Sequence, residues 1–176
     1  MYQCMLRLFL LLTSILVGTM AHGQKRKVVT LEPEIMRVES RWFYIEEVLD
    51  QREEENKMLG TVYTGLFGKP KKLVLLGGIE EGLEQYLQNA LPRMNTHTPV
   101  KMIVEDLEVK EQKGATKKSE MTIAVRFMAG ALESFDTQGT YQYNNAKVGV
   151  SYEDILKKTV RLVIETYAED GPRPEN

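Results

Sequence analysis

The sequence predicts an α+β fold: a two-layer sandwich in which two helices cover one face of a mixed, mainly antiparallel sheet of about four to five strands. Two segments, 79–91 and 152–167, repeat apolar residues at helical steps of three and four. Between these segments, three stretches alternate apolar and polar residues with the period of a half-buried strand. Two layers are the simplest way for striped helices and a sheet to bury their apolar faces.

The composition excludes several classes of protein. The 176 residues are 43% hydrophobic and 27% charged, with one cysteine and a formal net charge of −2. This mixture is not that of a collagen, a disulfide-stapled small protein or a multi-span membrane protein. The slightly acidic balance also argues against a general nucleic-acid binder. We therefore expect one globular domain.

The first residues have the pattern of a secretory signal peptide. One positive charge, Arg7, precedes the apolar run 8–17, which is shorter than the roughly 20 residues that span a bilayer. Small residues at Ala21 and Gly23 stand at −3 and −1 of a cleavage site. We predict a cleaved signal peptide at 1–23; an uncleaved anchor is the alternative.

Cleavage would leave a single domain at residues 24–176, exported to the bacterial periplasm or secreted. Cys4 lies before the apolar run, whereas a lipid-modified cysteine must follow it, so we expect no lipid anchor. The mature chain would then contain neither a disulfide nor a thiol nucleophile, and His97 would be its single histidine. About 150 residues suffice to bury roughly two-thirds of the surface of the unfolded chain.

The first predicted strands are short. Segments 27–30 and 34–39 are β-prone and are parted by Pro33, which lacks an amide donor and favours a sheet edge or a bend. Segment 41–49 is a stronger strand, rich in aromatic and β-branched residues. The charge run 50–57 is typical of a solvated loop.

A glycine-rich stretch precedes the first helix. Residues 60–72 are interpreted as a loop with a short extended piece, and 73–76 as a strand that leads into a helix over 79–91. Pro92 ends that helix. Gly82, inside the helix, indicates a close contact between helix and sheet.

Three strands follow the helix. In 99–110 the apolar alternation shifts phase after Val104, which predicts a β-bulge. Segments 119–129 and 134–143 alternate regularly, and the polar residues 111–118 form a hairpin connection.

The last helix has the clearest boundaries. Ser151 and Asp154 fit a capping box, an inward apolar stripe follows, and Gly171 with Pro172 ends it. The predicted order is therefore β, β, α, β, β, β, α. The strands on either side of the first helix should pair in parallel through a right-handed crossover. The three later strands should form an antiparallel meander.

Patterns that resemble catalytic or phosphate-binding motifs are incomplete. A phosphate loop ending at Lys69 would need glycine where Tyr63 stands and serine or threonine where Pro70 stands. Gly77-Gly78 before a helix is compatible with anion binding, but a tight turn is the simpler interpretation. His97 lies in a polar loop without a nucleophile elbow, which favours a surface histidine.

Metal and carboxylate chemistry have little support in the sequence. One histidine without cysteine does not make a zinc site. The acidic residues 53–55 lack the spacing of a calcium loop. A hydrolase that uses paired carboxylates, with Asp50 or Asp136, stays open as an alternative. We predict no catalytic residue, no metal site and no cofactor.

Basic residues occur in three small clusters, which are 25–27, the group of Lys69, Lys71 and Lys72, and 117–118. Acidic residues separate the clusters along the chain. They are interpreted as hairpin tips and solubilising charges. Contact with anionic lipid headgroups is the alternative.

One motif supports a resemblance to a known family. Asp50-Gln51-Arg52 at a strand end, the stretch 134–139 and the helix opening 151–156 together resemble YajG-like bacterial envelope lipoproteins over residues 40–168. The resemblance implies a small α/β envelope domain with no assigned enzyme activity. It supplies no catalytic residues, and this chain departs from the family in lacking the lipidated cysteine. Asp50 and Arg52 match the family's Asp-x-Arg; we interpret them as a structural pair that holds the following loop, with recognition as the alternative.

These observations predict a non-enzymatic exported accessory or binding domain. A sheet edge, or the cleft between sheet and helices, would receive an envelope protein or a small ligand. Nucleic acid is not expected as a partner, and membrane association is expected to be peripheral at most. The alternatives are an exported hydrolase that uses carboxylates alone, with Asp50, Asp136 and Asp154 as candidates, and a structural homo-oligomer.

Overall fold

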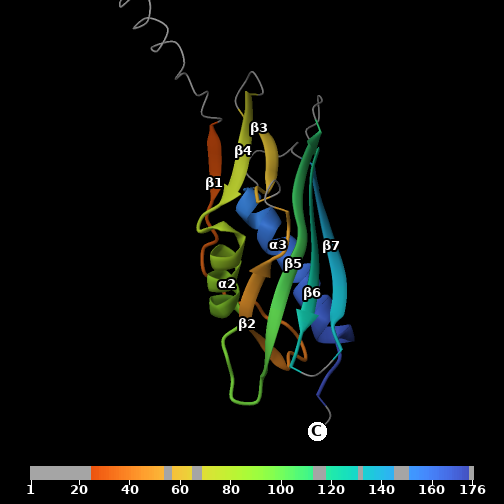
Figure 1. The fold of residues 1–176 in the computed structure, drawn as a ribbon. Coiled ribbons are helices and arrows are strands. Elements are labelled where there is room, and N and C mark those ends of the chain that lie inside the picture. Colours follow the sequence, from red (N-terminus) through yellow and green to blue (C-terminus); the bar gives the residue numbers. More distant parts are fainter. Residues whose placement is uncertain are drawn as a thin grey trace, which may run out of the picture.

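The computed structural model describes residues 25–53, 57–64, 69–112, 118–130, 133–144 and 151–174. The predicted signal peptide, the acidic residues 54–55 and most of the hairpin connection 111–118 lie outside these ranges. The elements run in this order (Figure 1): β1 (Arg26–Val29), β2 (Phe43–Asp50), β3 (Gly60–Thr64), β4 (Lys69–Leu75), α2 (Gly78–Ala90), β5 (Thr98–Gln112), β6 (Lys118–Met128), β7 (Phe135–Asn144) and α3 (Tyr152–Asp170).

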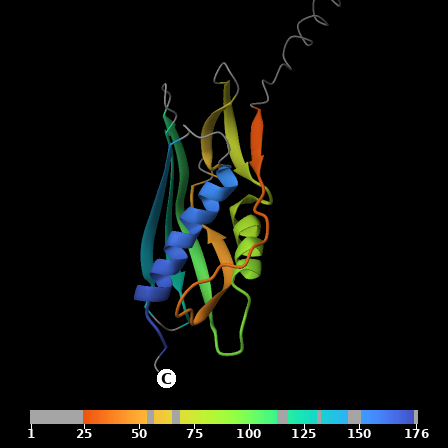
Figure 2. The same cartoon turned by 180° about the vertical axis from the view of Figure 1, so that it is seen from behind.

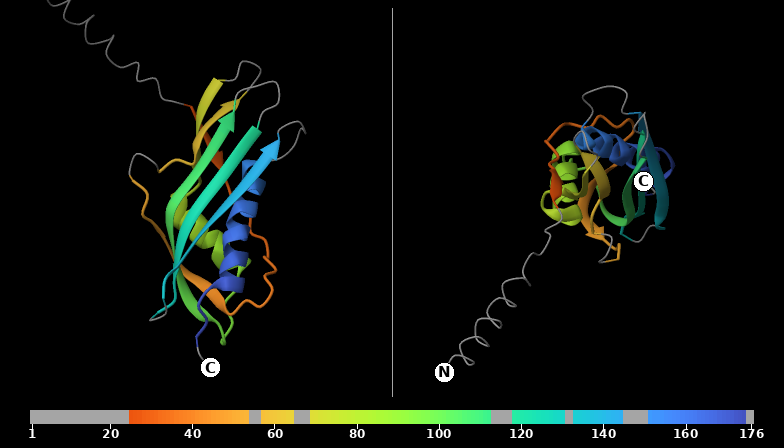
Figure 3. Two further views of the ribbon diagram at one scale, coloured as in Figure 1. Left: turned by 90° about the vertical axis from the view of Figure 1, so that its right-hand side faces the viewer. Right: turned by 90° about the horizontal axis from the view of Figure 1, so that it is seen from above.

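All seven strands belong to one mixed sheet. Its order is β1-β4-β3-β5-β6-β7, and β2 pairs with β5 beside this path. Two strands share one edge of the 15-residue strand β5, because β2 pairs in parallel with Thr98 to Val104 and β3 meets β5 only at Val109. The long pairings β5–β6 and β6–β7 are antiparallel, as predicted for the meander (Figure 3).

The α+β class is confirmed, but the prediction of four to five strands is wrong. Strand β3 lies in the segment interpreted as a loop with a short extended piece, and β4 begins at Lys69, four residues before the strand expected at 73–76. Together β3 and β4 form an antiparallel hairpin. Glycine and proline in this segment suggested turns. Gly60 instead sits at φ 137°, where an added Cβ would lie 2.5 Å from the carbonyl oxygen of Val109. The glycine therefore permits the close approach of β3 to β5.

The predicted parallel pairing across the first helix is also wrong. β4 leads into α2, but the β3–β4 hairpin reverses the chain, so β4 runs opposite to β5 and is separated from it by β3. The parallel partner of β5 is β2. The crossover therefore spans β3, β4 and α2 rather than the helix alone.

Several local predictions are confirmed. Helix α2 ends just before Pro92, and the register of β5 against β6 shifts between Val104 and Asp106, where the phase change predicts a bulge. Helix α3 begins with a complete capping box: the Ser151 side chain accepts from the amide of Asp154, and the Asp154 side chain accepts from the amide of Ser151. These features depend on residues close in sequence.

Both helices lie on the same side of the curled sheet (Figure 2). Their buried residues join those of the strands in a single core, with Leu83 and Leu87 from α2, Val160 and Val163 from α3, and Ile123 from β6. The core packs without a disulfide among the described residues, since the single cysteine of the chain is Cys4.

An extended strap, residues 30–41, connects β1 to β2 and is bonded to both helices. The amide of Met36 donates to the carbonyl of Ala90 at the end of α2 (2.9 Å), and the Met36 side chain is buried. The amide of Glu32 donates to the Glu153 carboxylate of α3 (2.8 Å). The expectation of a β-prone piece at 34–39 is wrong, because the strap pairs with helices rather than with a strand.

Candidate functional site

The structure brings Asp50 and Arg52 into a two-point ion pair at the end of β2. Nε of Arg52 donates to Oδ1 of Asp50 (2.8 Å) and Nη2 donates to Oδ2 (2.9 Å). The side chain of Arg52 is 2% exposed and that of Asp50 9%. A planar guanidinium fits a carboxylate in this way, which a lysine does not.

Arg52 also fills a gap in the sheet. Its Nη1 donates to the carbonyl oxygens of Met58 (3.1 Å) and Leu107 (3.1 Å). Leu107 lies on β5 between the residues that pair with β2 and Val109, which meets β3. The guanidinium thus takes the place of a strand at the junction of β2 and β3, and it holds the loop that joins them.

The charge of Arg52 controls the ionisation of Asp50. Burial by itself would raise the pKa of the Asp50 carboxyl, but the hydrogen bonds and the positive charge of Arg52 outweigh it and hold that pKa below its ordinary value of 3.8. Asp50 is therefore ionised at neutral pH. Both groups are occupied by each other, which suits the structural interpretation of the pair and leaves little free hydrogen-bonding capacity for a ligand.

The three carboxylates of the hydrolase alternative occupy separate settings. Asp136 on β7 binds Nε of Arg126 (2.8 Å) on the outer face of the sheet. Asp154 caps α3, and Asp50 binds Arg52. The three carboxylates thus lie on three different elements, and each bonds to a partner of its own. Among the residues that the structure describes, no group of three histidine, cysteine or acidic side chains is placed to hold a metal ion.

His97 and the glycine turn likewise lack partners for chemistry. Nδ1 of His97 is buried and has no hydrogen-bond partner among the described residues, and burial together with the nearby charge of Arg41 lowers the pKa of this imidazole. Gly77 and Gly78 have φ angles of 78° and 82° and form the tight turn before α2. The charged side chains that line the hollow at this turn are Asp50, Glu80, Glu81 and one lysine, Lys57. The carboxylates outnumber the single ammonium group, so the side chains around the hollow disfavour an anion there.

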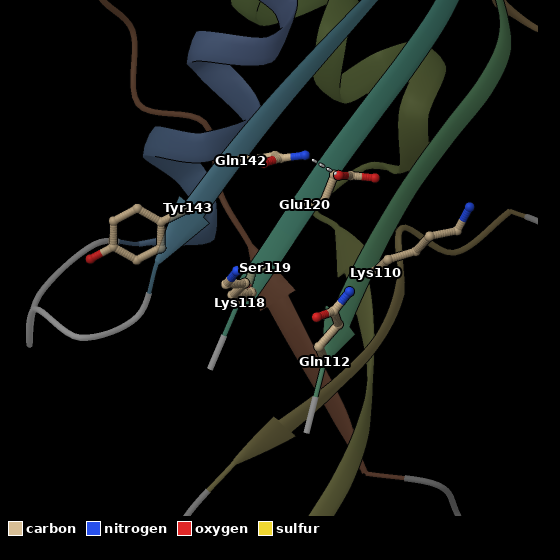
Figure 4. A pocket seen from close by; sticks show the side chains of 7 residues that line it. All are labelled: Lys110, Gln112, Lys118, Ser119, Glu120, Gln142 and Tyr143. Carbon is tan, nitrogen blue, oxygen red and sulfur yellow. Dashed lines mark hydrogen bonds between the residues drawn. The ribbon is translucent and has the colours of Figure 1, made fainter. Parts of the chain in front are cut away.

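One pocket lies where β5 and β7 end and β6 begins (Figure 4). It is open and polar, with a volume of about 210 Å³, and its lining includes Lys110, Gln112 and Tyr143. Gln142 donates to the Glu120 carboxylate across its wall (2.7 Å), and Lys110 is paired with Glu108 (3.0 Å). These side chains already bond to one another, so the pocket resembles an ordinary polar surface of a sheet.

The outer edge of β2 is covered by helix α2. Three side chains at every fourth position of α2 bond to the β2 backbone: Glu84 accepts from the Val48 amide (3.1 Å), Glu80 accepts from the Asp50 amide (3.0 Å), and Gln88 donates to the Glu46 carbonyl (3.3 Å). A strand edge whose groups are satisfied in this way cannot add another strand. The sequence shows the polar stripe on α2, but it does not show that this stripe bonds to the backbone of β2.

The edge of β7, in contrast, is open. Among the described residues, this ten-residue strand pairs with β6 alone, and no side chain hydrogen-bonds to its backbone between Phe135 and Gln142. An apolar shoulder runs beside it, made of half-buried Phe135 and Tyr141 and of Leu162 on α3, which is 39% exposed. Gly139 lets α3 approach this closely, because an added Cβ would lie 3.1 Å from the Thr159 carbonyl oxygen.

Comparisons with known proteins give only a distant structural likeness. No protein-family model matches the chain, and no curated protein matches it. A crystal structure of a Xanthomonas campestris protein, described under the family model DUF330, is similar to 82% of this chain and 96% of its own, with 6% identity and a TM-score of 0.48. Within the described residues, no helix has the length and apolar character needed to cross a bilayer.

Proposed function

We propose that the chain is a non-enzymatic, exported accessory domain that binds an extended segment of an envelope protein along the edge of β7. The observation that carries this proposal is the contrast between the edges of the sheet. The edge of β2 is closed by side chains of α2, and β1 has only four residues, whereas no described side chain hydrogen-bonds to the β7 backbone from Phe135 to Gln142.

Strand addition at β7 has a clear physical basis. An added strand gains main-chain hydrogen bonds from the edge, and its alternate side chains find contacts beside it. The shoulder of Phe135, Tyr141 and Leu162 would supply apolar contacts on the helix side. Soluble proteins commonly protect long edges with lysine or proline. The β7 sequence FDTQGTYQYN contains neither residue.

The resemblance to envelope lipoproteins and the predicted signal peptide support an exported setting for this binding. The absence of a legible catalytic set in the sequence supports a role other than catalysis. A second copy of the chain could add its own β7 at the same edge, which is the homo-oligomer alternative. The experiment below separates these occupants.

A photo-crosslinking amino acid at Gln138 or Thr140 on β7, in cells that express the full chain, tests the edge. Thr122 on β6 is the matched control, because its hydroxyl lies 3.2 Å from that of Thr140 on the same face. We expect one envelope protein to be crosslinked from the β7 positions and not from Thr122. With the crosslinking residue at Gln138, Thr140→Lys should abolish this product, whereas Thr122→Lys should not.

Two results would refute the proposal. One is the same set of products from β7 and β6 positions, and the other is a product that Thr140→Lys leaves unchanged. A crosslink to the chain itself would favour the homo-oligomer instead. Export is checked separately by cell fractionation and by the mass of the N-terminus, which we expect to begin at Gln24.

A further inference from the structure

Two basic clusters that lie far apart in the sequence are adjacent in the fold. Strand β1 pairs in parallel with β4, so Arg26 stands directly opposite Lys72. The amide of Lys72 also donates to the carbonyl of Lys25 (3.2 Å). With Lys69 and Lys71 on β4, these residues form what we name the basic edge, which consists of Lys25, Arg26, Lys69, Lys71 and Lys72.

The described acidic side chains leave the basic edge unneutralised. Strands β1, β3 and β4 contain no aspartate or glutamate. Within the described part of the chain, none of the five residues forms an ion pair. Elsewhere on the sheet, several basic side chains are neutralised, as Lys101 is by Glu47 (2.6 Å) and Arg126 by Glu105 (2.6 Å). Five basic side chains without a described ion pair therefore gather along two adjacent strands.

The unneutralised positive charge of the basic edge lowers the stability of the folded state. Residues directly opposite each other on paired strands project to the same face, and like charges there are destabilising. Arg26 and Lys72 are such a pair. The chain as a whole has a formal charge of −2, so the basic edge has the opposite sign to the rest of the molecule.

The basic edge also lies where the described chain begins. Lys25 is the first described residue, and β1 and the start of β4 stand together at one end of the molecule (Figure 1). The apolar run 8–17 lies a few residues earlier in the sequence. Any attachment of that run to a bilayer would bring this end of the molecule to the lipid surface.

We infer that the basic edge docks on a membrane surface containing anionic lipid headgroups. A lipid surface is planar and meets one corner of the protein. The negatively charged rest of the molecule then stays farther from the lipid headgroups than the screening length of about 8–10 Å at physiological salt. An extended polyanion such as DNA would instead run along the acidic remainder and be repelled. Each lysine or arginine near an anionic surface strengthens binding about fivefold.

Vesicle sedimentation of the full chain tests the inference, with the N-terminus of every sample determined by mass spectrometry. The test variant is Lys69→Gln/Lys71→Gln/Lys72→Gln. The matched control, Arg93→Gln/Lys101→Gln/Lys158→Gln, removes the same charge from exposed positions outside the basic edge. Vesicles contain phosphatidylethanolamine and phosphatidylglycerol, or phosphatidylcholine alone. Because all variants share one N-terminus, any contribution of the apolar run cancels.

We expect the test variant to bind anionic vesicles about 100-fold more weakly than the unaltered chain. The control should lose less than fivefold, and binding should fall steeply with salt. Lys72→Glu separates loss of binding from misfolding. It should weaken binding to anionic vesicles about 25-fold, because it changes the charge by two units. Its attraction to Arg26 should leave the melting temperature unchanged or higher.

Equal loss in both triple variants, unaltered binding of the test variant, or equal binding to phosphatidylcholine would overturn the inference. Tighter binding to a DNA duplex than to vesicles would overturn the assignment to lipid. The proposed β7 function fails or succeeds separately, since the test variant leaves β7 untouched and its crosslinks should persist.

Discussion

Replacing Arg52 by methionine is the sharpest test of how the β2–β3 junction is held. The side chain makes four hydrogen bonds, two to Asp50 and one each to the carbonyls of Met58 and Leu107. Methionine keeps most of the apolar stem and removes every donor. The Asp50 carboxylate would then be largely buried without its partner.

The structure sets the size of the effect. Breaking a buried ion pair by removing one partner costs about 3–5 kcal/mol. Asp50 is 9% exposed and lies at the end of a strand, so its carboxylate can relax toward water, which places the expected loss near 3 kcal/mol. Arg52→Lys should cost about half as much, because it keeps the charge but not the two-point geometry.

Urea unfolding followed by the fluorescence of Trp42, the single tryptophan of the chain, measures the loss. With a slope near 2 kcal/mol per molar urea, the midpoint should fall by about 1.5 M. Arg93→Met is the matched control, since Arg93 is exposed over the ring of Tyr44 and should shift stability by less than about 0.5 kcal/mol.

A double-mutant cycle decides whether the pair acts as a unit. Asp50→Asn/Arg52→Met removes both charges and should cost about 2 kcal/mol less than the sum of the single variants. A loss below about 1 kcal/mol for Arg52→Met, or strict additivity in the cycle, would refute the structural role assigned to this pair.

Three further predictions concern stability. Acid should weaken the fold through Asp50, because the pKa of its carboxyl in the folded chain lies below the ordinary value of 3.8. The stabilisation by the Asp50–Arg52 pair is therefore complete above pH 3.8 and is lost as the pH falls through the lowered pKa. Urea titrations from about pH 6 to pH 2 should show this loss in the unaltered chain and not in Arg52→Met. Gly139→Val should lower stability by about 2 kcal/mol, because even a Cβ lies 3.1 Å from Cγ1 of Val163; thermal melts check it, and an unchanged melting temperature would contradict the close packing of α3 on β7. Ser151→Ala should cost about 1 kcal/mol through loss of the cap of α3, and Ser151→Thr should recover most of it in the same urea assay.

The parts of the fold that depend on near neighbours could be predicted from the sequence. The stripe of α2, the capping box of α3 and the bulge after Val104 each lie within a few residues, and the structure confirms all three. Strand β3 was interpreted as part of a loop, although Thr-Val-Tyr-Thr at 61–64 has high β propensity, and β4 was expected only from residue 73. Glycine and proline beside it suggested a loop, and tertiary pairing with β5 decided the outcome.

The features that position the candidate sites could not be predicted, because they depend on register between distant segments. Arg26 and Lys72 become neighbours only through the pairing of β1 with β4. The cover on β2 needs the polar stripe of α2 to align with amides 30 to 36 residues away. Asp50 and Arg52 were identified because they match the Asp-x-Arg motif of the family that the sequence resembles, but the bond from Arg52 to Leu107 spans 55 residues.

The way β2 and β3 share one edge of β5 has a consequence for dynamics. The corner formed by β1, β4 and β3 is joined to the central strand by few main-chain bonds, at Gly60 and Val109 and between Leu59 and Val109, with Arg52 beside them. Its amides should exchange with solvent by local opening at a lower free energy than those of β5 and β6. The molecule would then carry its concentrated positive charge on a sub-structure that can loosen while the meander stays closed.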